Sequence, residues 1–226
     1  MDAFFPFFFI IGIIAVIAGL AIFGYLQEKK RREAFQRLAA DLGFAYRAGK
    51  DYGIPTRYNF LNKLSTGSNR YAQNILEGEL EGFLLHCFDY HYETYSTDSK
   101  GRRQTHHHRF SYFILEMRKS FPELLIYPEG FFSKVGQFIG FDDIDFESIE
   151  FSKAFVVKSK DKKFAYDICH TRMMEYLLKH PDLSLEIEGP CLAMGFGSRL
   201  TPEEVEKRLK QMVTLRKLLP EYLFRD

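Results

Sequence analysis

The chain has 226 residues, and its 31 Lys and Arg nearly balance its 30 Asp and Glu, which gives a formal net charge of +1. This balance argues against nucleic acid as a partner, because proteins that bind it carry a basic surplus against the phosphates. The three cysteines are odd in number and lie in apolar runs, which favours buried thiols in a reducing compartment over a disulfide framework.

The N-terminal segment is an uncharged apolar run. Residues 3–27 carry no charged side chain, and the basic residues Lys29, Lys30, Arg31 and Arg32 follow almost at once. About 20 apolar helical residues are enough to cross a bilayer core about 30 Å thick. The run is too long for the apolar core of a signal peptide, and it has no polar face. We therefore predict a transmembrane anchor over residues 1–27, and a single-pass protein, because no comparable run follows.

The basic cluster after the anchor predicts the orientation of the protein. Lys and Arg are retained on the cytoplasmic side, so we expect the N-terminus outside and the rest on the cytoplasmic side of the cell (inner) membrane. The same four residues can attract anionic headgroups. Within the anchor, Gly12, Ala15 and Gly19 form a stripe that fits helix packing in the bilayer, or they are small residues scattered in an ordinary span.

Residues 28–43 predict a basic juxtamembrane helix. Phe35, Leu38, Ala39 and Leu42 recur at helical spacing, and Gly43 is placed to end the helix. A further short helix is expected around residues 58–64.

The middle of the chain changes to a period of two, which is typical of strands. We predict strands over residues 74–80, 83–94 and 106–117, with a tight turn at Glu81-Gly82. Antiparallel pairing of the last two strands places Asp89 opposite Arg109, or in a register slipped by two residues.

The C-terminal part mixes short strands and helices. We expect strands over residues 124–127 and 151–158, helices over 131–139 and 161–179, and a hairpin of 183–188 with 191–196 around Gly189-Pro190. Thr201, Pro202 and Glu204 form a capping box that begins a last helix. The order of elements predicts an α+β domain over residues 44–226, with antiparallel sheet and packed helices, and a lobe boundary near 150 as an alternative.

The histidines are the strongest candidates for chemistry. In a strand, His107 points away from its neighbours His106 and His108, toward His91 and Glu93. Two imidazoles and a carboxylate can bind zinc or a related divalent ion. The alternative is a polar hairpin that faces solvent, and no resident cofactor is predicted.

Three segments carry a resemblance to known proteins. They are GFDDIDFE at residues 140–147, EFSKAFVV at 150–157, and a helix that opens near Asp161 and ends in MMEYLL at 173–178. Together with the layout of the chain, they resemble a group of uncharacterised bacterial membrane-anchored proteins. The resemblance implies a bacterial cell membrane and a cytoplasmic domain, and it brings no known activity or catalytic residues.

These features predict a non-enzymatic, membrane-tethered domain that binds a protein partner or scaffolds a membrane complex. Its expected partners are the lipid bilayer and either another protein or a second copy of the chain. One alternative is a lipid- or ligand-sensing module at the inner membrane face. Another is a metal-dependent hydrolase that uses His91, Glu93 and His107.

Overall fold

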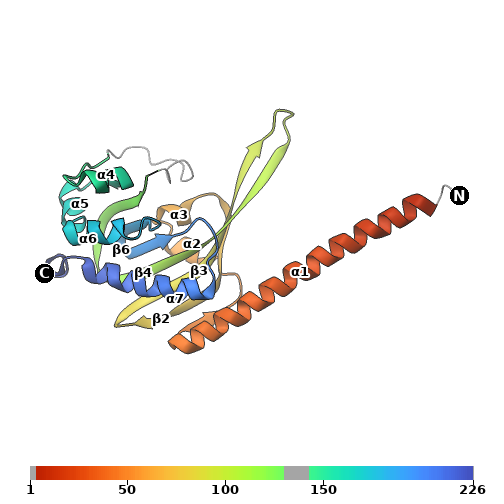
Figure 1. Ribbon diagram of the computed structural model, residues 1–226, viewed down its shortest axis with the longest axis horizontal. Helices are drawn as coiled ribbons and strands as arrows, with labels where there is room; N and C mark the ends of the chain where they lie inside the picture. The colour runs from red at the N-terminus through yellow and green to blue at the C-terminus, as the bar shows by residue number, and fades with distance from the viewer. Residues whose placement is uncertain (1–3, 130–142, 226) are drawn as a thin grey trace.

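A long helix projects from an α+β domain in the computed structural model, which describes residues 4–129 and 143–225 (Figure 1). This helix, α1 (Phe4–Leu42), runs without a break through residue 27. The predicted anchor and the predicted basic helix are therefore two halves of one element. Gly43 follows with φ of 70°, a left-handed conformation that suits glycine and ends the helix.

The described part of the domain is built on a six-stranded antiparallel sheet. The strands follow the order β1-β2-β3-β4-β5, and β6 also pairs with β4. Because β4 is long, it pairs with β3 over residues 103–115, with β6 over 112–126 and with β5 over 124–128. The strands are β1 (Ala45–Arg47), β2 (Ser68–Leu80), β3 (Phe83–Thr97), β4 (Arg103–Pro128), β5 (Phe155–Ser159) and β6 (Leu185–Gly195).

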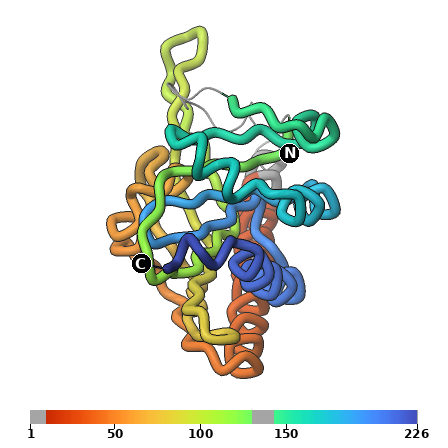
Figure 2. The backbone as a smooth tube through the Cα atoms, turned by 90° about the vertical axis from the view of Figure 1, so that its left-hand side faces the viewer, coloured from red at the N-terminus to blue at the C-terminus, as the bar shows by residue number. Residues whose placement is uncertain are grey.

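The pairing of β3 with β4 follows the second of the two predicted registers. Asp89 lies opposite Ser111, and His91 lies opposite Arg109. A slip of two residues keeps every side chain on its predicted face, because the side-chain period of a strand is two. The hairpin is longer than expected, and it projects beyond the rest of the domain (Figures 1 and 2).

The predicted reversal of the chain around Gly189-Pro190 is present, but its two arms pair with β4 and not with each other. β6 continues through both residues and pairs with β4 on either side of them. Gly189, with φ of 53°, lies opposite Phe121 at an irregularity in the register. Ser184 Oγ, beside the start of β6, donates to the carbonyl oxygen of Gly195 at its end at 2.8 Å, so the strand doubles back at the Gly-Pro pair. β4 bends at the same level, so the separate strand expected at residues 124–127 is its continuation.

The helices differ from prediction mainly in where they break. The helix expected at 161–179 is interrupted at His170, which has extended backbone and whose Nε2 lies 2.9 Å from the Leu218 carbonyl oxygen. The strand expected at 151–158 begins as a helix capped by Ser148. The helix expected at 131–139 lies outside the described residues. The observed helices are α2 (Gly53–Arg57), α3 (Asn62–Ser65), α4 (Ile149–Ala154), α5 (Lys162–Ile168), α6 (Thr171–Leu178), α7 (Pro202–Leu218) and the 3-10 helix η2 (Glu221–Phe224).

The capping box of α7 is confirmed. Thr201 Oγ1 accepts a hydrogen bond from the Glu204 N–H at 3.3 Å, and Glu204 Oε2 accepts one from the Thr201 N–H at 2.7 Å. These two bonds satisfy backbone donors that the first helical turn leaves without an intrahelical partner.

Helices cover both faces of the sheet. The base of α1 packs beside α7 on one face, where Phe35 joins a large core with Phe113 and Leu209 (Figure 2). α2 and α3 cover the other face, where Leu61 packs with Phe88 in a second cluster. β5 and β6 follow residue 150 in the chain but extend the sheet that β2–β4 begin. The fold is therefore α+β, as predicted.

Candidate functional site

The base of α1 is joined to the sheet by a buried ion pair. Arg31 donates from Nε and Nη2 to the two carboxylate oxygens of Asp89, at 2.8 and 2.7 Å. Asp89 is 1% exposed, and it also accepts hydrogen bonds from Asn74 Nδ2 and Ser111 Oγ. A buried carboxylate is tolerated when it is paired and hydrogen-bonded in this way. A bidentate contact adds geometric specificity, so it restricts the orientation of Arg31 on the sheet.

A second carboxylate of α1 extends this network. Glu28 accepts hydrogen bonds from Arg199 Nη1 at 3.0 Å and from Asn74 Nδ2 at 3.3 Å. Burial acts to raise the pKa of Glu28, but the hydrogen bond from Arg199 and further contacts outweigh it, so the pKa lies below its ordinary value. Tyr46 donates to Asn74 Oδ1, and burial raises the pKa of Tyr46 to about 12. We call Glu28, Arg31, Asn74, Asp89 and Arg199 the α1 junction.

The α1 junction changes how the basic cluster is interpreted. Arg31 points into the domain, and its side chain is only 15% exposed. Lys29 is exposed and lies 4.0 Å from Glu33, and Lys30 and Arg32 are exposed as well. The prediction that the cluster contacts headgroups therefore depends on Lys29, Lys30 and Arg32.

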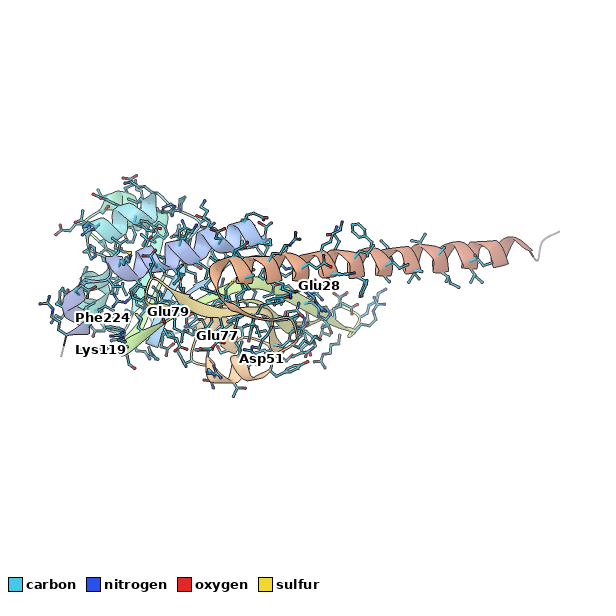
Figure 3. All side chains as sticks on the ribbon, turned by 90° about the horizontal axis from the view of Figure 1, so that it is seen from below. Glu28, Asp51, Glu77, Glu79, Lys119 and Phe224 are labelled. Carbon is cyan, nitrogen blue, oxygen red and sulfur yellow. The ribbon has the colours of Figure 1, made fainter. Side chains whose placement is uncertain are left out.

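The apolar half of α1 has no packing partner in the described part of the chain. Its large side chains between Ile10 and Leu26 are exposed, with Ile14 at 60% (Figure 3). The helix is long and apolar enough to cross a membrane. A side chain added at Gly12 or Gly19 would meet nothing within 4 Å. Gly12, Ala15 and Gly19 are all exposed, so helix packing at the predicted stripe stays a prediction.

His91, Glu93 and His107 come together in the β3–β4 hairpin. Each offers one ligand atom, and these atoms lie within 4.8 Å of one another. His91 Nε2 lies 3.2 Å from His107 Nδ1, which lies 3.4 Å from Glu93 Oε1. Glu93, and not His91, is directly opposite His107 in the sheet. His106 and His108 instead contact Ser96 and Thr94, as the alternation of side chains predicts.

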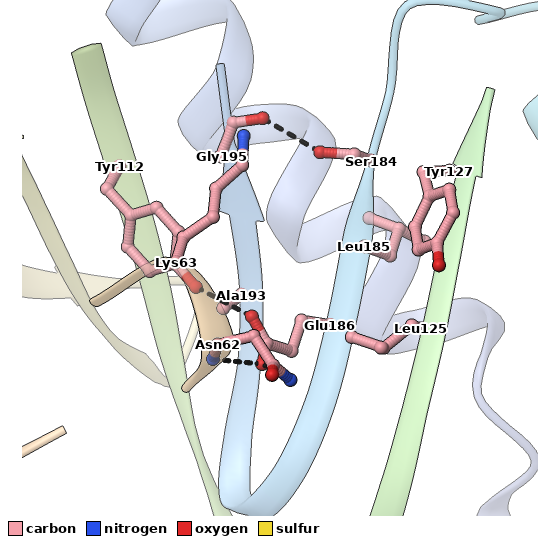
Figure 4. Close-up of a pocket in the computed structure, with 10 residues that line it drawn as sticks. All are labelled: Asn62, Lys63, Tyr112, Leu125, Tyr127, Ser184, Leu185, Glu186, Ala193 and Gly195. Carbon is pink, nitrogen blue, oxygen red and sulfur yellow. Dashed lines mark hydrogen bonds between the residues drawn. The ribbon is translucent and has the colours of Figure 1, made fainter. Parts of the chain in front are cut away.

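A buried carboxylate, Glu186, and a half-buried lysine, Lys63, line a small cavity between α3, β4 and β6 (Figure 4). Glu186 accepts hydrogen bonds from the backbone and side-chain N–H groups of Asn62 and from the Tyr112 hydroxyl. Burial lowers the pKa of Lys63 to about 8. The cavity has a volume of about 30 Å³, so it holds one or two water molecules and no substrate.

A larger groove lies at the end of the domain away from the apolar half of α1 (Figure 3). Its volume is about 590 Å³, and its walls combine apolar and charged side chains. Lys119 donates to the Arg225 carbonyl oxygen at 2.8 Å, so the C-terminal segment forms part of the rim. The groove is lined by Gly82, Phe83, Glu116, Met117, Arg118, Lys119, Arg216, Glu221 and Phe224.

Sequence reasoning missed the α1 junction and Glu186. A signal was present, because Asp89 and Glu186 each interrupt an apolar strand, and isolated acids in such strands are seldom buried without a partner. The partners could not be named from sequence, because Arg31 and Asp89 are 58 positions apart. The distance between them closes only when α1 packs on the sheet.

Comparison with known proteins identifies a similar fold. No protein-family model and no curated protein matches the chain. The crystal structure of the mycobacterial trehalose monomycolate transport factor A, TtfA, is similar, with a TM-score of 0.60 and 14% sequence identity. The match covers 85% of this chain and 96% of that one. This likeness shows a shared fold.

Proposed function

We propose that this chain is a single-pass membrane protein whose domain holds a partner protein at the cytoplasmic face of the membrane, without catalysing a reaction. The observation that carries this proposal is the double use of α1. Its apolar side chains between Ile10 and Leu26 are exposed, while its second half contributes to the core of the domain through Phe35 and the α1 junction. A domain joined to its anchor in this way presents its surfaces at a fixed angle to the bilayer.

The size of one described cavity and the lining residues of another support binding over catalysis. The cavity beside Glu186, at about 30 Å³, has room for water molecules only. The open groove combines Phe83, Met117 and Phe224 with charged residues, a mixture that suits a peptide segment of another protein. TtfA is described as a transport factor, and this description supports an accessory role for the present chain too.

The proposed orientation depends on the basic residues that stay exposed. Lys29, Lys30 and Arg32 follow the apolar half of α1, and such residues are retained on the cytoplasmic side. Orientation can be read with a membrane-impermeant thiol reagent, because Cys87, Cys169 and Cys191 are all buried. A Ser99→Cys variant at the hairpin tip should be labelled in inverted membrane vesicles and protected in intact cells. Labelling in intact cells would contradict the orientation.

Site-specific photo-crosslinking in native membranes tests partner binding. A photoreactive residue at Arg118, which is exposed and lines the groove, should give one defined adduct. The matched control is Tyr52, which is 57% exposed and does not line the groove. Phe224→Ala, which removes an apolar wall, should weaken the adduct at Arg118. Identical adducts at both positions, or none at Arg118, would contradict a partner in the groove.

A second candidate function is contact with anionic lipid, and the placement of the hairpin favours it. The β3–β4 hairpin projects on the side from which the apolar half of α1 leaves the domain (Figures 1 and 3). Its tip carries Lys100, Arg102 and Arg103, and the Arg103 guanidinium lies 3.6 Å from the centre of the Tyr95 ring. In nanodiscs, anionic lipid should slow thiol labelling of Ser99→Cys, and substitution of the three basic residues by Gln should restore it. Equal labelling with neutral and anionic lipid would reject this function.

A further inference from the structure

The histidine–glutamate cluster of the hairpin has distances that fit a metal centre. Zinc binds imidazole nitrogen at about 2.0–2.1 Å in tetrahedral geometry, so two ligand atoms on one ion lie about 3.3 Å apart. The His91 Nε2–His107 Nδ1 distance is 3.2 Å, and the His107 Nδ1–Glu93 Oε1 distance is 3.4 Å. Two edges of the coordination tetrahedron are thus already at their expected lengths, and the third pair of atoms lies within 4.8 Å.

The orientation of His91 is fixed by its surroundings. Its Nδ1 lies 3.1 Å from the Asn69 carbonyl oxygen, which can only accept a hydrogen bond. Nδ1 therefore donates, and in the neutral ring the lone pair of Nε2 points toward His107. The His91 ring is 4% exposed and stacks on Tyr71 with ring centres 4.5 Å apart. Metal-binding histidines are commonly held by a carbonyl in this manner.

Glu93 is held by two further donors. Asn69 Nδ2 donates to Oε1 at 2.6 Å, and the Tyr95 hydroxyl donates to Oε2 at 3.1 Å. Asn69 thus orients two of the three side chains, one through its carbonyl and one through its amide. Its backbone is left-handed, with φ of 47°, which places both groups on the same cluster.

We propose that His91, Glu93 and His107 bind one divalent cation of the zinc class, with the fourth position open to water. Two imidazoles and one carboxylate favour zinc over magnesium and calcium, which prefer oxygen ligands. Arg109 lies opposite His91, so its positive charge opposes binding of any divalent cation, and the imidazole ligands must supply the selectivity. Without metal, an Nδ1 proton on the neutral His107 ring can bond to His91 Nε2 or Glu93 Oε1, so binding through Nδ1 requires the tautomer whose proton is on Nε2.

Bound metal would tie both strands of the hairpin together next to the α1 junction. Asp89, His91 and Glu93 alternate along β3 and share one face of the sheet. The site therefore continues the face on which Arg31 meets Asp89. This placement assigns the cation a role in holding the hairpin at a fixed angle, independent of whether a partner occupies the distant groove.

Isothermal titration of the full-length, untagged protein in detergent with zinc, and with magnesium as a comparison, tests the proposal. We expect one zinc per chain, no magnesium binding, and a Tm that rises by roughly 5–10 °C at a zinc concentration 100 times Kd. Cobalt should give the absorption spectrum of a tetrahedral site. Absence of stoichiometric zinc binding would overturn the proposal.

The neighbouring histidines provide matched controls. His107→Gln should weaken zinc binding by more than about 100-fold, whereas His106→Gln and His108→Gln on the opposite face should leave it within about twofold. Asn69→Gly keeps the left-handed backbone and the carbonyl but removes the amide, and it should weaken binding by about 10-fold. Because His107 is half exposed, its variant should fold, which the Tm without metal verifies. Equal losses in all three histidine variants would show adventitious binding to the exposed tract and overturn the proposal.

Discussion

The two halves of α1 reverse the usual distribution of polarity. In the half between Ile10 and Leu26 the apolar side chains are exposed, whereas in the half that follows, Arg31 and Glu28 are partly buried and ion-paired. The second half of α1 has the pattern expected of a protein in water, because its buried charges are paired. The first half does not have this pattern, and its apolar surface suits the hydrocarbon core of a bilayer. The two halves of one helix are therefore suited to different surroundings.

The largest effect is expected from breaking the buried ion pair. Arg31→Met leaves Asp89 buried without its cation, and removal of one partner of such a pair costs about 3–5 kcal/mol of unfolding free energy. Arg32→Met, one position along the helix and exposed, should change it by less than about 0.5 kcal/mol. Chemical denaturation of the full chain in detergent measures both. Equal effects of the two variants would mean that the α1 junction does not hold α1 to the domain.

A similar loss of unfolding free energy is expected when an apolar contact of the second half of α1 is removed. Phe35 is fully buried among core residues of the sheet and α7, so Phe35→Ala should destabilise the domain by about 3–4 kcal/mol. Gln36→Ala, on the exposed side of the helix, is the matched control. If Phe35→Ala unfolds no earlier than this control, the second half of α1 is not part of the core.

A charge placed in the first half of α1 should impair membrane insertion and leave the stability of the domain unchanged. Ile14→Arg places a charge near the centre of the expected span and costs about 3 kcal/mol of membrane insertion. The domain itself should unfold as before, because Ile14 contacts none of its described residues. Carbonate extraction of membranes measures insertion, and denaturation measures the domain. Unchanged membrane retention would remove the case for an anchor.

The smallest effect concerns a carboxylate without the pairing that Asp89 has. Burial, followed by the charges of Glu123 and Glu186, raises the pKa of Glu188 to about 7. A raised pKa means that the folded state binds the proton more tightly, so this contribution to stability is lost as pH rises from about 4.5 through 7. Glu188→Gln should therefore stabilise the protein by about 1 kcal/mol at pH 8 and by almost nothing at pH 4.5. If the difference in unfolding free energy between Glu188→Gln and wild type is the same at pH 8 and at pH 4.5, the raised pKa is contradicted.

How far the sequence predicted the structure depended on the range of the interactions. The capping box at Thr201 and the strand period around His107 involve near neighbours, and both were predicted correctly. The reversal at Gly189-Pro190 was also predicted from local residues, but the pairing of both its arms with β4 was not, because it depends on contacts distant in the chain. The α1 junction needed contacts between residues far apart in the chain. The cluster of His91, Glu93 and His107 could be predicted from the sequence because one hairpin contains all three residues.

We expect the apolar half of α1 and the domain to move as one rigid body. The distribution of distances between two spin labels, one on each part, is the sharpest test of this expectation. The labels belong at Ala21→Cys in the apolar half of α1 and at Thr214→Cys on the exposed side of α7, and the native cysteines are buried. In nanodiscs, the account predicts one narrow distribution that broadens when Arg31→Met is added. A distribution that is already broad in the protein with Arg31 intact would contradict it.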